Sequence, residues 1–275
     1  MYMDGTRGKA LVFLFLFVCG SLLGQIVTSD THTLGLASAS NPTILTGVHG
    51  LYANPASIHV GSYKWQATTS GLNRYGTDIF TFSGAASFNF NESIGLGLSV
   101  GSHGISGFKE NFATLSFSRQ VGSASYLALQ PQLYRLDVEG LGQRTTWDVT
   151  LGYFGHLSSS LNLSAHVEQI RSFLSSDDDR AGSVVFGIGY ELSDIAELYS
   201  SIRYTSTDQV IFSPGIRYRP HEILDFYISV STSPSTIAFG TSVDIQTNTQ
   251  VHVGYEAHPD LGSSLGLALT YSILP

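Results

Sequence analysis

The chain has 275 residues, enough for one large barrel or for one to two ordinary globular domains. Charged residues make up only 12%, below the roughly 25% of a soluble domain, yet the mean hydropathy is only +0.13. After residue 24 the sequence has no apolar window of the about 18 residues that a membrane helix needs, which argues against a helical membrane protein, and the formal net charge of −8 argues against nucleic acid as a partner.

Residues 1–24 have the three regions of a secretory signal peptide. Arg7 and Lys9 precede an apolar stretch, and small residues follow it up to Gly24. Cleavage after Gly24 would leave 11 Lys and Arg against 20 Asp and Glu, a formal charge of −9. The single cysteine, Cys19, lies inside this peptide and follows Val18, where a lipoprotein signal would have a small residue. The mature chain is therefore predicted to contain no thiol for a disulfide, a nucleophile or a metal site.

Residues 25–62 are rich in Ser, Thr, Gly and Ala and lack the alternation of a strand. They contain the triplet Asn54, Pro55 and Ala56. Because Asn54 precedes a proline it is pushed out of the α region, its amide can bond neighbouring backbone, and Pro55 restricts φ. Such a rigid turn could hold a plug against a barrel wall; an ordinary loop turn is the alternative.

From position 63 onward the chain repeats a run of about ten residues in which apolar residues alternate with small or polar ones, which is typical of a strand with one apolar face. The clearest run is the last, where Leu265, Leu267 and Leu269 alternate with Gly266 and Ala268. Fourteen runs are predicted, near residues 63–72, 78–90, 93–103, 111–121, 125–138, 143–155, 160–171, 181–192, 196–205, 208–219, 223–232, 235–245, 248–257 and 263–273.

The runs match the roughly 9 to 11 residues that a transmembrane strand needs, whereas strands of soluble sandwiches usually have about five or six. The sequence therefore predicts an all-β fold, a transmembrane antiparallel β-barrel of about 14 strands over residues 63–275.

The connections alternate between tight turns and looser loops, the latter including Gly104–Glu110 and Leu174–Arg180. Outer-membrane barrels have short turns on the periplasmic side and longer loops outside. We therefore expect a location in the cell outer membrane with both termini periplasmic. Aromatic residues near strand ends are candidates for interfacial girdles: Tyr63, Trp65, Phe90, Tyr153, Tyr190, Tyr204, Tyr218 and Tyr271.

Charged and histidine side chains gather on the strand face opposite the apolar one, which is the face that a barrel turns to its lumen. An ionised group on the lipid face would cost about 2 to 4 kcal/mol near the midplane. The residues of this predicted lumen network are Lys64, Asp148, His166, Glu168, Glu191, Arg203, Arg217, Arg219, Asp225, Asp244, His252 and Glu256.

Two pairs in this network, His166 with Glu168 and His252 with Glu256, raise the alternative of a metal or acid–base site, because like-facing residues of a strand lie close together. Charges inside a barrel more often bond to one another and to a plug, so we expect no catalytic residue, no bound metal and no cofactor.

Two prolines, Pro131 and Pro214, fall inside predicted strands, where each removes a hydrogen-bond donor from the ladder. A local bulge is one outcome, and a lateral opening toward lipid is the other.

The Asn54-Pro55-Ala56 triplet, placed directly before the first strand of a signal-bearing, roughly fourteen-stranded chain, resembles the FadL-type outer-membrane transport family, and also the related PorV-type proteins of the type IX secretion system. The resemblance implies that residues 25–62 form an N-terminal hatch that plugs the barrel. Two features depart from the family: the chain is shorter than the long-chain fatty-acid transporters, and its outer loops look too short for their hydrophobic capture groove.

The leading hypothesis is passive transport of small hydrophobic molecules, with the hatch as gate and a defect in the wall as exit. The alternative is a PorV-like component that binds secretion-machinery proteins without transporting a solute. An outer-membrane enzyme is disfavoured, because no nucleophile, base and orienting group can be assembled from the spacing of the residues. The expected partners are membrane lipid and a hydrophobic small molecule.

Overall fold

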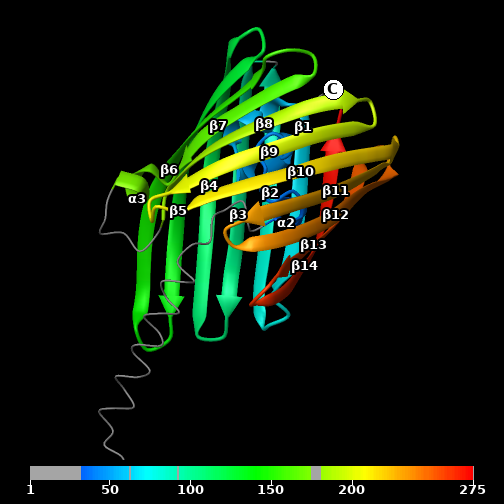
Figure 1. The fold of residues 1–275 in the computed structure, drawn as a ribbon. Coiled ribbons are helices and arrows are strands. Elements are labelled where there is room, and N and C mark those ends of the chain that lie inside the picture. Colours follow the sequence, from blue (N-terminus) through cyan, green and yellow to red (C-terminus); the bar gives the residue numbers. More distant parts are fainter. Residues whose placement is uncertain (1–31, 62, 92, 175–180, 275) are drawn as a thin grey trace, which may run out of the picture.

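The computed structural model describes residues 32–61, 63–91, 93–174 and 181–274, so the predicted signal peptide lies outside the described residues. Fourteen antiparallel strands close into a barrel, in which β1 pairs with β14 and every other strand pairs with its neighbours in the chain (Figure 1). The predicted fold class is thereby confirmed. The strands are β1 (Trp65–Arg74), β2 (Ile79–Asn91), β3 (Ile94–Ile105), β4 (Phe108–Gly122), β5 (Ser125–Val138), β6 (Gly142–His156), β7 (Leu161–Glu168), β8 (Ser183–Ser193), β9 (Ala196–Thr205), β10 (Val210–His221), β11 (Leu224–Thr232), β12 (Ser235–Gln246), β13 (Thr249–His258) and β14 (Gly262–Ile273).

Alternation along each strand separates an apolar outer face from a polar inner one. In β14, Leu265, Leu267 and Leu269 are exposed on the outside, whereas Ser264 and Thr270 are buried inside. Most of the large exposed hydrophobic side chains of the molecule occupy such outward positions on the strands. An apolar exterior around a polar interior is the arrangement of a transmembrane barrel. Among the described residues, no helix is both long and apolar enough to cross a membrane.

The predicted loop Gly104–Glu110 is wrong, because β3 and β4 extend into it. Ile105 pairs with Phe108, which leaves only Ser106 and Gly107 in the turn. Gly107 has a φ of +82°, a conformation that glycine adopts without the steric cost of a side chain. A tight hairpin therefore replaces the loop.

The predicted strand 160–171 is also shorter than expected, because β7 ends at Glu168 and the helix α3 (Ile170–Leu174) follows. Gln169 between them has a φ of +52°, which turns the chain out of the sheet. The Asp148 carboxylate of β6 accepts hydrogen bonds from the backbone N–H groups of Arg171 and Ser172 at 2.9 and 3.1 Å, and so stabilises the first turn of the helix. Of the predicted loop Leu174–Arg180, residues 175–180 lie outside the described residues.

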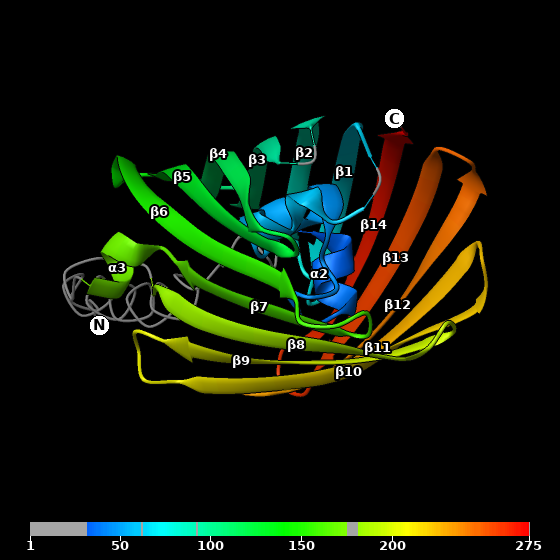
Figure 2. The same ribbon diagram turned by 90° about the horizontal axis from the view of Figure 1, so that it is seen from above.

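Residues 32–60, called here the interior segment, lie inside the ring of strands (Figure 2). They form the helix α2 (Thr33–Ala37) and two 3-10 helices, η2 (Gly47–Tyr52) and η3 (Pro55–His59). All of these residues are buried except Ala39, Thr46 and Val60, which are half-buried. The apolar core of the protein therefore lies between the interior segment and the inner wall. One cluster joins Leu51, Tyr52 and Ile58 to Phe112 and Tyr134, and another joins Leu34, Ala37 and Leu45 to Tyr199 and Tyr227.

Candidate functional site

The triplet Asn54-Pro55-Ala56 anchors the interior segment to the wall. Asn54 is fully buried, has an extended backbone and caps η3 by accepting the N–H of Ala56 at 3.0 Å, with Pro55 in the first turn. Its amide nitrogen donates to the carbonyl oxygen of Tyr153 at 2.7 Å and to the Ser164 hydroxyl oxygen at 2.6 Å. Both sides of the Asn54 amide are thus used, one for the local turn and one for β6 and β7.

Glycines on the inner wall provide the space into which the interior segment fits. A Cβ at Gly152 would lie 2.1 Å from Oδ1 of Asn54, and one at Gly240 would lie 2.2 Å from the Cβ of Ala37. Non-bonded atoms do not approach so closely, so a larger residue at either position would push the interior segment away from the wall. The small residues on the lumen face therefore form the seat of the interior segment.

All twelve residues of the predicted lumen network occupy the inward-facing register of their strands, or its continuation just beyond a strand end. They do not form one network. Three of them meet in a buried cluster, four lie in ion pairs at one mouth of the barrel or beside them, two bond to neutral groups, one lies against α3, and the last two stand near strand ends.

The buried cluster is centred on Glu168. Its carboxylate accepts hydrogen bonds from Nε2 of His166 at 2.9 Å and from the Ser183 hydroxyl at 2.8 Å, and it forms an ion pair with Arg203. Arg203 also donates to the Ser183 hydroxyl oxygen at 3.0 Å. Every oxygen of Glu168 is therefore occupied by a neighbour in the wall, which is the arrangement of a structural ion cluster.

At the mouth where the termini of the barrel lie, two ion pairs bridge neighbouring strands. Arg217 of β10 binds Glu197 of β9 at 2.8 Å, and Arg219 binds both oxygens of Asp225 of β11 at 2.7 and 3.0 Å. Glu191 lines a small cavity of about 100 Å³ beside these groups. Glu197 was not among the predicted residues, although it shares the register of Arg203 on β9 and the same alternation rule would have selected it.

The remaining predicted residues play separate parts. Asp148 holds α3 as described above. The Asp244 carboxylate is hydrogen bonded to Gln250. Lys64 is exposed just before β1, and Glu256 is half-buried near the end of β13. His252 is buried and bonds to the hydroxyl groups of Ser242 and Thr270 rather than to Glu256. Within the described ranges, no group of three His, Cys, Asp or Glu side chains is placed to hold a metal ion.

The two strand prolines differ in their effect on the wall. At Pro131 the ladder between β4 and β5 is interrupted between the pairs Thr114–Gln132 and Phe117–Leu129, and it resumes in the same register. At Pro214 the ladder does not resume: the pairs between β10 and β11 run from Gly215–Ser229 to His221–Leu224. Pro131 is therefore a local interruption, whereas Pro214 marks the end of a ladder.

Beyond Pro214, side chains bridge the two strands. The N–H of Phe212 donates to the Thr232 hydroxyl oxygen at 3.0 Å, and the hydroxyl oxygens of Ser213 and Ser231 lie 2.8 Å apart. This part of the wall, residues 210–214 of β10 and 230–232 of β11, is called here the seam. It lies toward the end of the barrel opposite the termini, because the turns that follow β9 and β11 are at that end.

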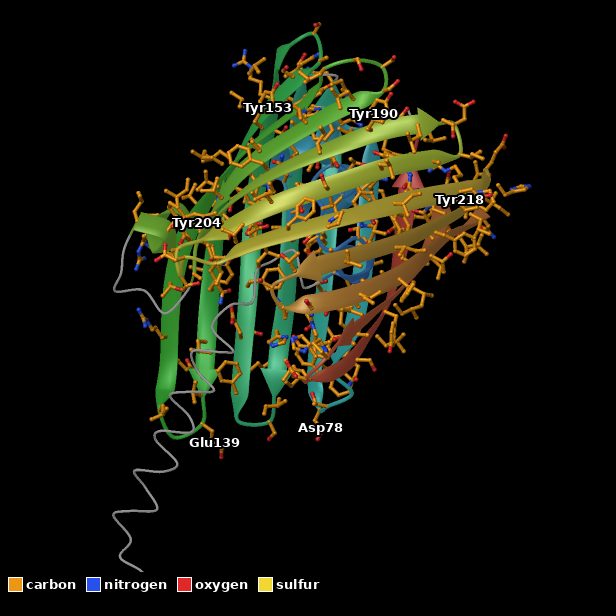
Figure 3. The ribbon with its side chains drawn as sticks, in the orientation of Figure 1. Asp78, Glu139, Tyr153, Tyr190, Tyr204 and Tyr218 are labelled. Atoms are coloured by element: carbon orange, nitrogen blue, oxygen red, sulfur yellow. The ribbon has the colours of Figure 1, made fainter. Side chains whose placement is uncertain are left out.

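Aromatic side chains stand at strand ends as the sequence predicts. Tyr153, Tyr190 and Tyr218 lie around the end of the barrel that carries the C-terminus, whereas Asp78 and Glu139 lie on turns at the other end (Figure 3). Tyr190 and Tyr218 are exposed on the outer face. Their positions fit one interfacial girdle of a membrane barrel.

No protein-family model and no curated protein matches the chain. Solved structures match it over most of its length. A Pseudomonas aeruginosa FadL homologue matches with a TM-score of 0.64 and 10% identity, over 88% of this chain and 98% of that one. The Pseudomonas putida toluene transporter TodX matches with a TM-score of 0.60 and 10% identity, over 85% and 97%. The Ralstonia pickettii toluene transporter TbuX matches with a TM-score of 0.60 and 9% identity, over 87% and 98%. The chain therefore has the fold of FadL-type channels.

Proposed function

We propose that the chain is an outer-membrane channel for the passive transport of small hydrophobic molecules, with residues 25–62 as its hatch and residues 63–275 as its barrel. The observation that carries the proposal is a barrel with an apolar exterior whose lumen is occupied by the preceding segment of the same chain. The match in fold to two toluene transporters favours an apolar solute over a polar one. The comparisons lend no support to the PorV-like alternative.

The proposed orientation has both termini in the periplasm. The longest connection, between β7 and β8, is at the end opposite the termini, as expected for an external face. The seam lies toward that same end. We assign it as the lateral exit, because parting it would break two side-chain hydrogen bonds instead of a row of backbone pairs.

A disulfide across the seam tests this assignment. The facing hydroxyls of Ser213 and Ser231 suit replacement by cysteines, and the periplasm favours oxidation. In Gram-negative cells without their own transporter, uptake of radiolabelled toluene by the Ser213→Cys/Ser231→Cys variant should fall to the level of cells lacking the chain, and should return when the cells are treated with a reductant.

The matched control is Ser99→Cys/Thr114→Cys, whose hydroxyl oxygens lie 2.6 Å apart across the unbroken ladder between β3 and β4. A disulfide there links a ladder that is already closed, so uptake should be unchanged. Equal loss in both disulfide variants, or parental uptake by the oxidised seam variant, would exclude the seam as the exit.

The hatch is tested by Asn54→Ala together with Pro55→Gly. The change removes the two bonds to Tyr153 and Ser164 and loosens the cap of η3, while the backbone pairs of the wall stay intact. Single-channel conductance of the mature protein in planar bilayers should rise relative to the parent. A variant that assembles with parental conductance and parental toluene uptake would remove the triplet from the mechanism.

A further inference from the structure

Three histidines meet where the interior segment touches the wall. His32 precedes α2, His49 lies in η2, and His252 belongs to β13. The ring centroids of His32 and His49 are 4.7 Å apart, those of His49 and His252 are 4.9 Å apart, and those of His32 and His252 are 6.4 Å apart. All three side chains are buried. We call these three residues the histidine latch.

The hydrogen bonds determine which nitrogen of His32 carries the proton. The Thr68 hydroxyl donates to the carbonyl oxygen of Leu269 at 3.2 Å and accepts from the Thr270 hydroxyl at 3.0 Å. Its single proton is thus used, so Nε2 of His32, at 3.2 Å, donates to the Thr68 oxygen. Nδ1 of His32 accepts the backbone N–H of Leu34 at 3.1 Å. His32 is therefore neutral in this arrangement.

The same reasoning holds for the other two rings. Because Thr270 gives its proton to Thr68, its oxygen accepts from Nε2 of His252 at 3.0 Å and from Nε2 of His49 at 3.3 Å. Nδ1 of His252 accepts from the Ser242 hydroxyl at 2.6 Å. Nδ1 of His49 is buried and has no hydrogen-bond partner in the described part of the chain. One proton on each Nε2 satisfies every bond in the latch.

A second proton on His32 or on His49 would disturb this arrangement. On His32 it would point at the N–H of Leu34, and on His49 it would enter a site where the described residues offer no acceptor. Each imidazolium would also lie within 4.7 to 6.4 Å of the other rings, so that two of them would repel each other without water between them.

Few neighbouring groups would favour a charge on the latch. The ring of Tyr52 stacks on His32 at 4.8 Å. From β11, Asp225 attracts a proton on His252, but both its oxygens already bind Arg219. The phenol of Tyr227, also on β11, bonds Ser242 and carries no negative charge near neutral pH.

We propose that the histidine latch holds the interior segment against the wall at neutral pH and releases it when the pH falls. Burial lowers the pKa of both His32 and His49 well below the ordinary value of 6.5. Repulsion from His252 lowers the pKa of His32 further, and repulsion from His32 and His252 lowers that of His49 further. The docked segment therefore binds fewer protons than the undocked one. The equilibrium constant for docking has its full value above about pH 6.5. Below that pH it falls by up to about tenfold per pH unit for each histidine that must be neutral. The inference concerns docking alone and holds whatever molecule the barrel passes.

Thiol labelling of the mature full-length chain in liposomes tests the latch. Val48 is fully buried in η2, so a maleimide reaches Val48→Cys only when the segment leaves its seat. Ser123→Cys, on an exposed turn, reports how pH changes the thiol reaction itself. The labelling rate at position 48, divided by that at position 123, should rise at least about tenfold between pH 7.5 and pH 5.0. A ratio that stays constant over this range would overturn the proposal.

Variants identify the histidines responsible. In the His32→Asn/His49→Gln/His252→Gln variant the amides keep the cap of α2 and the donors to Thr270 but take up no proton, so the pH dependence should disappear. If the triple variant does not assemble, each single variant should flatten the profile, and parental profiles in all three would contradict the latch.

The control is His103→Gln, a buried histidine of β3 whose Nδ1 lies 2.7 Å from the Thr81 hydroxyl oxygen and which is not one of the latch residues. It should keep the parental profile. Loss of the pH dependence in His103→Gln, with persistence in the triple variant, would assign the effect to another part of the wall.

Discussion

At the scale of single residues, the contact between Asn54 and Gly152 shows how the interior segment is held. A side chain at position 152 would displace Asn54, because the amide oxygen of Asn54 fills the space next to the Cα of Gly152. The two residues lie almost a hundred positions apart in the chain, and only their meeting in space gives the glycine its role. The predicted motif therefore holds the segment only together with the wall residues that contact Asn54.

Gly152→Ala should weaken the seating of the segment by about 1 to 3 kcal/mol, because it pushes the buried Asn54 amide away from its partners on β6 and β7. The measurement is the labelling rate of Val48→Cys at pH 7.5, which should increase. Gly84→Ala is the control, since that glycine faces outward and a Cβ there would meet only the Thr68 carbonyl at an ordinary 3.7 Å. Equal labelling rates of the two variants would show that the absence of a side chain at position 152 is not needed to hold the interior segment in place.

At the scale of elements, the facing of the strands decides which substitutions a membrane barrel tolerates. Leu267 is 61% exposed at the middle of β14 and points outward, whereas Gln250 on the adjacent β13 points inward near Asp244. Both belong to the same part of the wall. They therefore form a matched pair for testing which face meets lipid.

Leu267→Arg should lower the free energy of unfolding in lipid by about 2 to 4 kcal/mol, because it places a charge near the bilayer midplane. Gln250→Arg should cost much less, since its charge would lie in the lumen beside a carboxylate. Denaturant unfolding in liposomes compares the two. Equal destabilisation would mean that the outward face does not meet hydrocarbon.

At the scale of the whole molecule, the closed ladder predicts resistance to detergent. Every strand is paired with a neighbour on both sides, so the sheet closes on itself and, outside the seam, unfolding cannot begin without loss of backbone pairs. The mature chain should fractionate with the outer membrane, and on gels it should migrate faster unboiled than boiled. Recovery as a soluble periplasmic protein would contradict the membrane location.

The sequence by itself determined the strands and their facing, because alternation of apolar and polar residues is a local pattern that a single strand already shows. Thirteen of the predicted runs became strands over most of their lengths, and the run at 160–171 became one only as far as Glu168. The loop expected at Gly104–Glu110 failed for a local reason that the pattern did not reveal, since Gly107 allows a two-residue turn.

Only the tertiary structure decided how the interior segment is held and where a strand ladder of the wall ends. His32 and His49 belong to no periodic pattern or motif, and they contact His252 only because the barrel closes around them. Pro131 and Pro214 look alike in the sequence, but pairing with the neighbouring strand resumes beyond one and ends at the other. The physical reason is the same in both cases: these properties depend on contacts between residues that lie far apart in the chain or on different strands, and a local pattern does not specify such contacts.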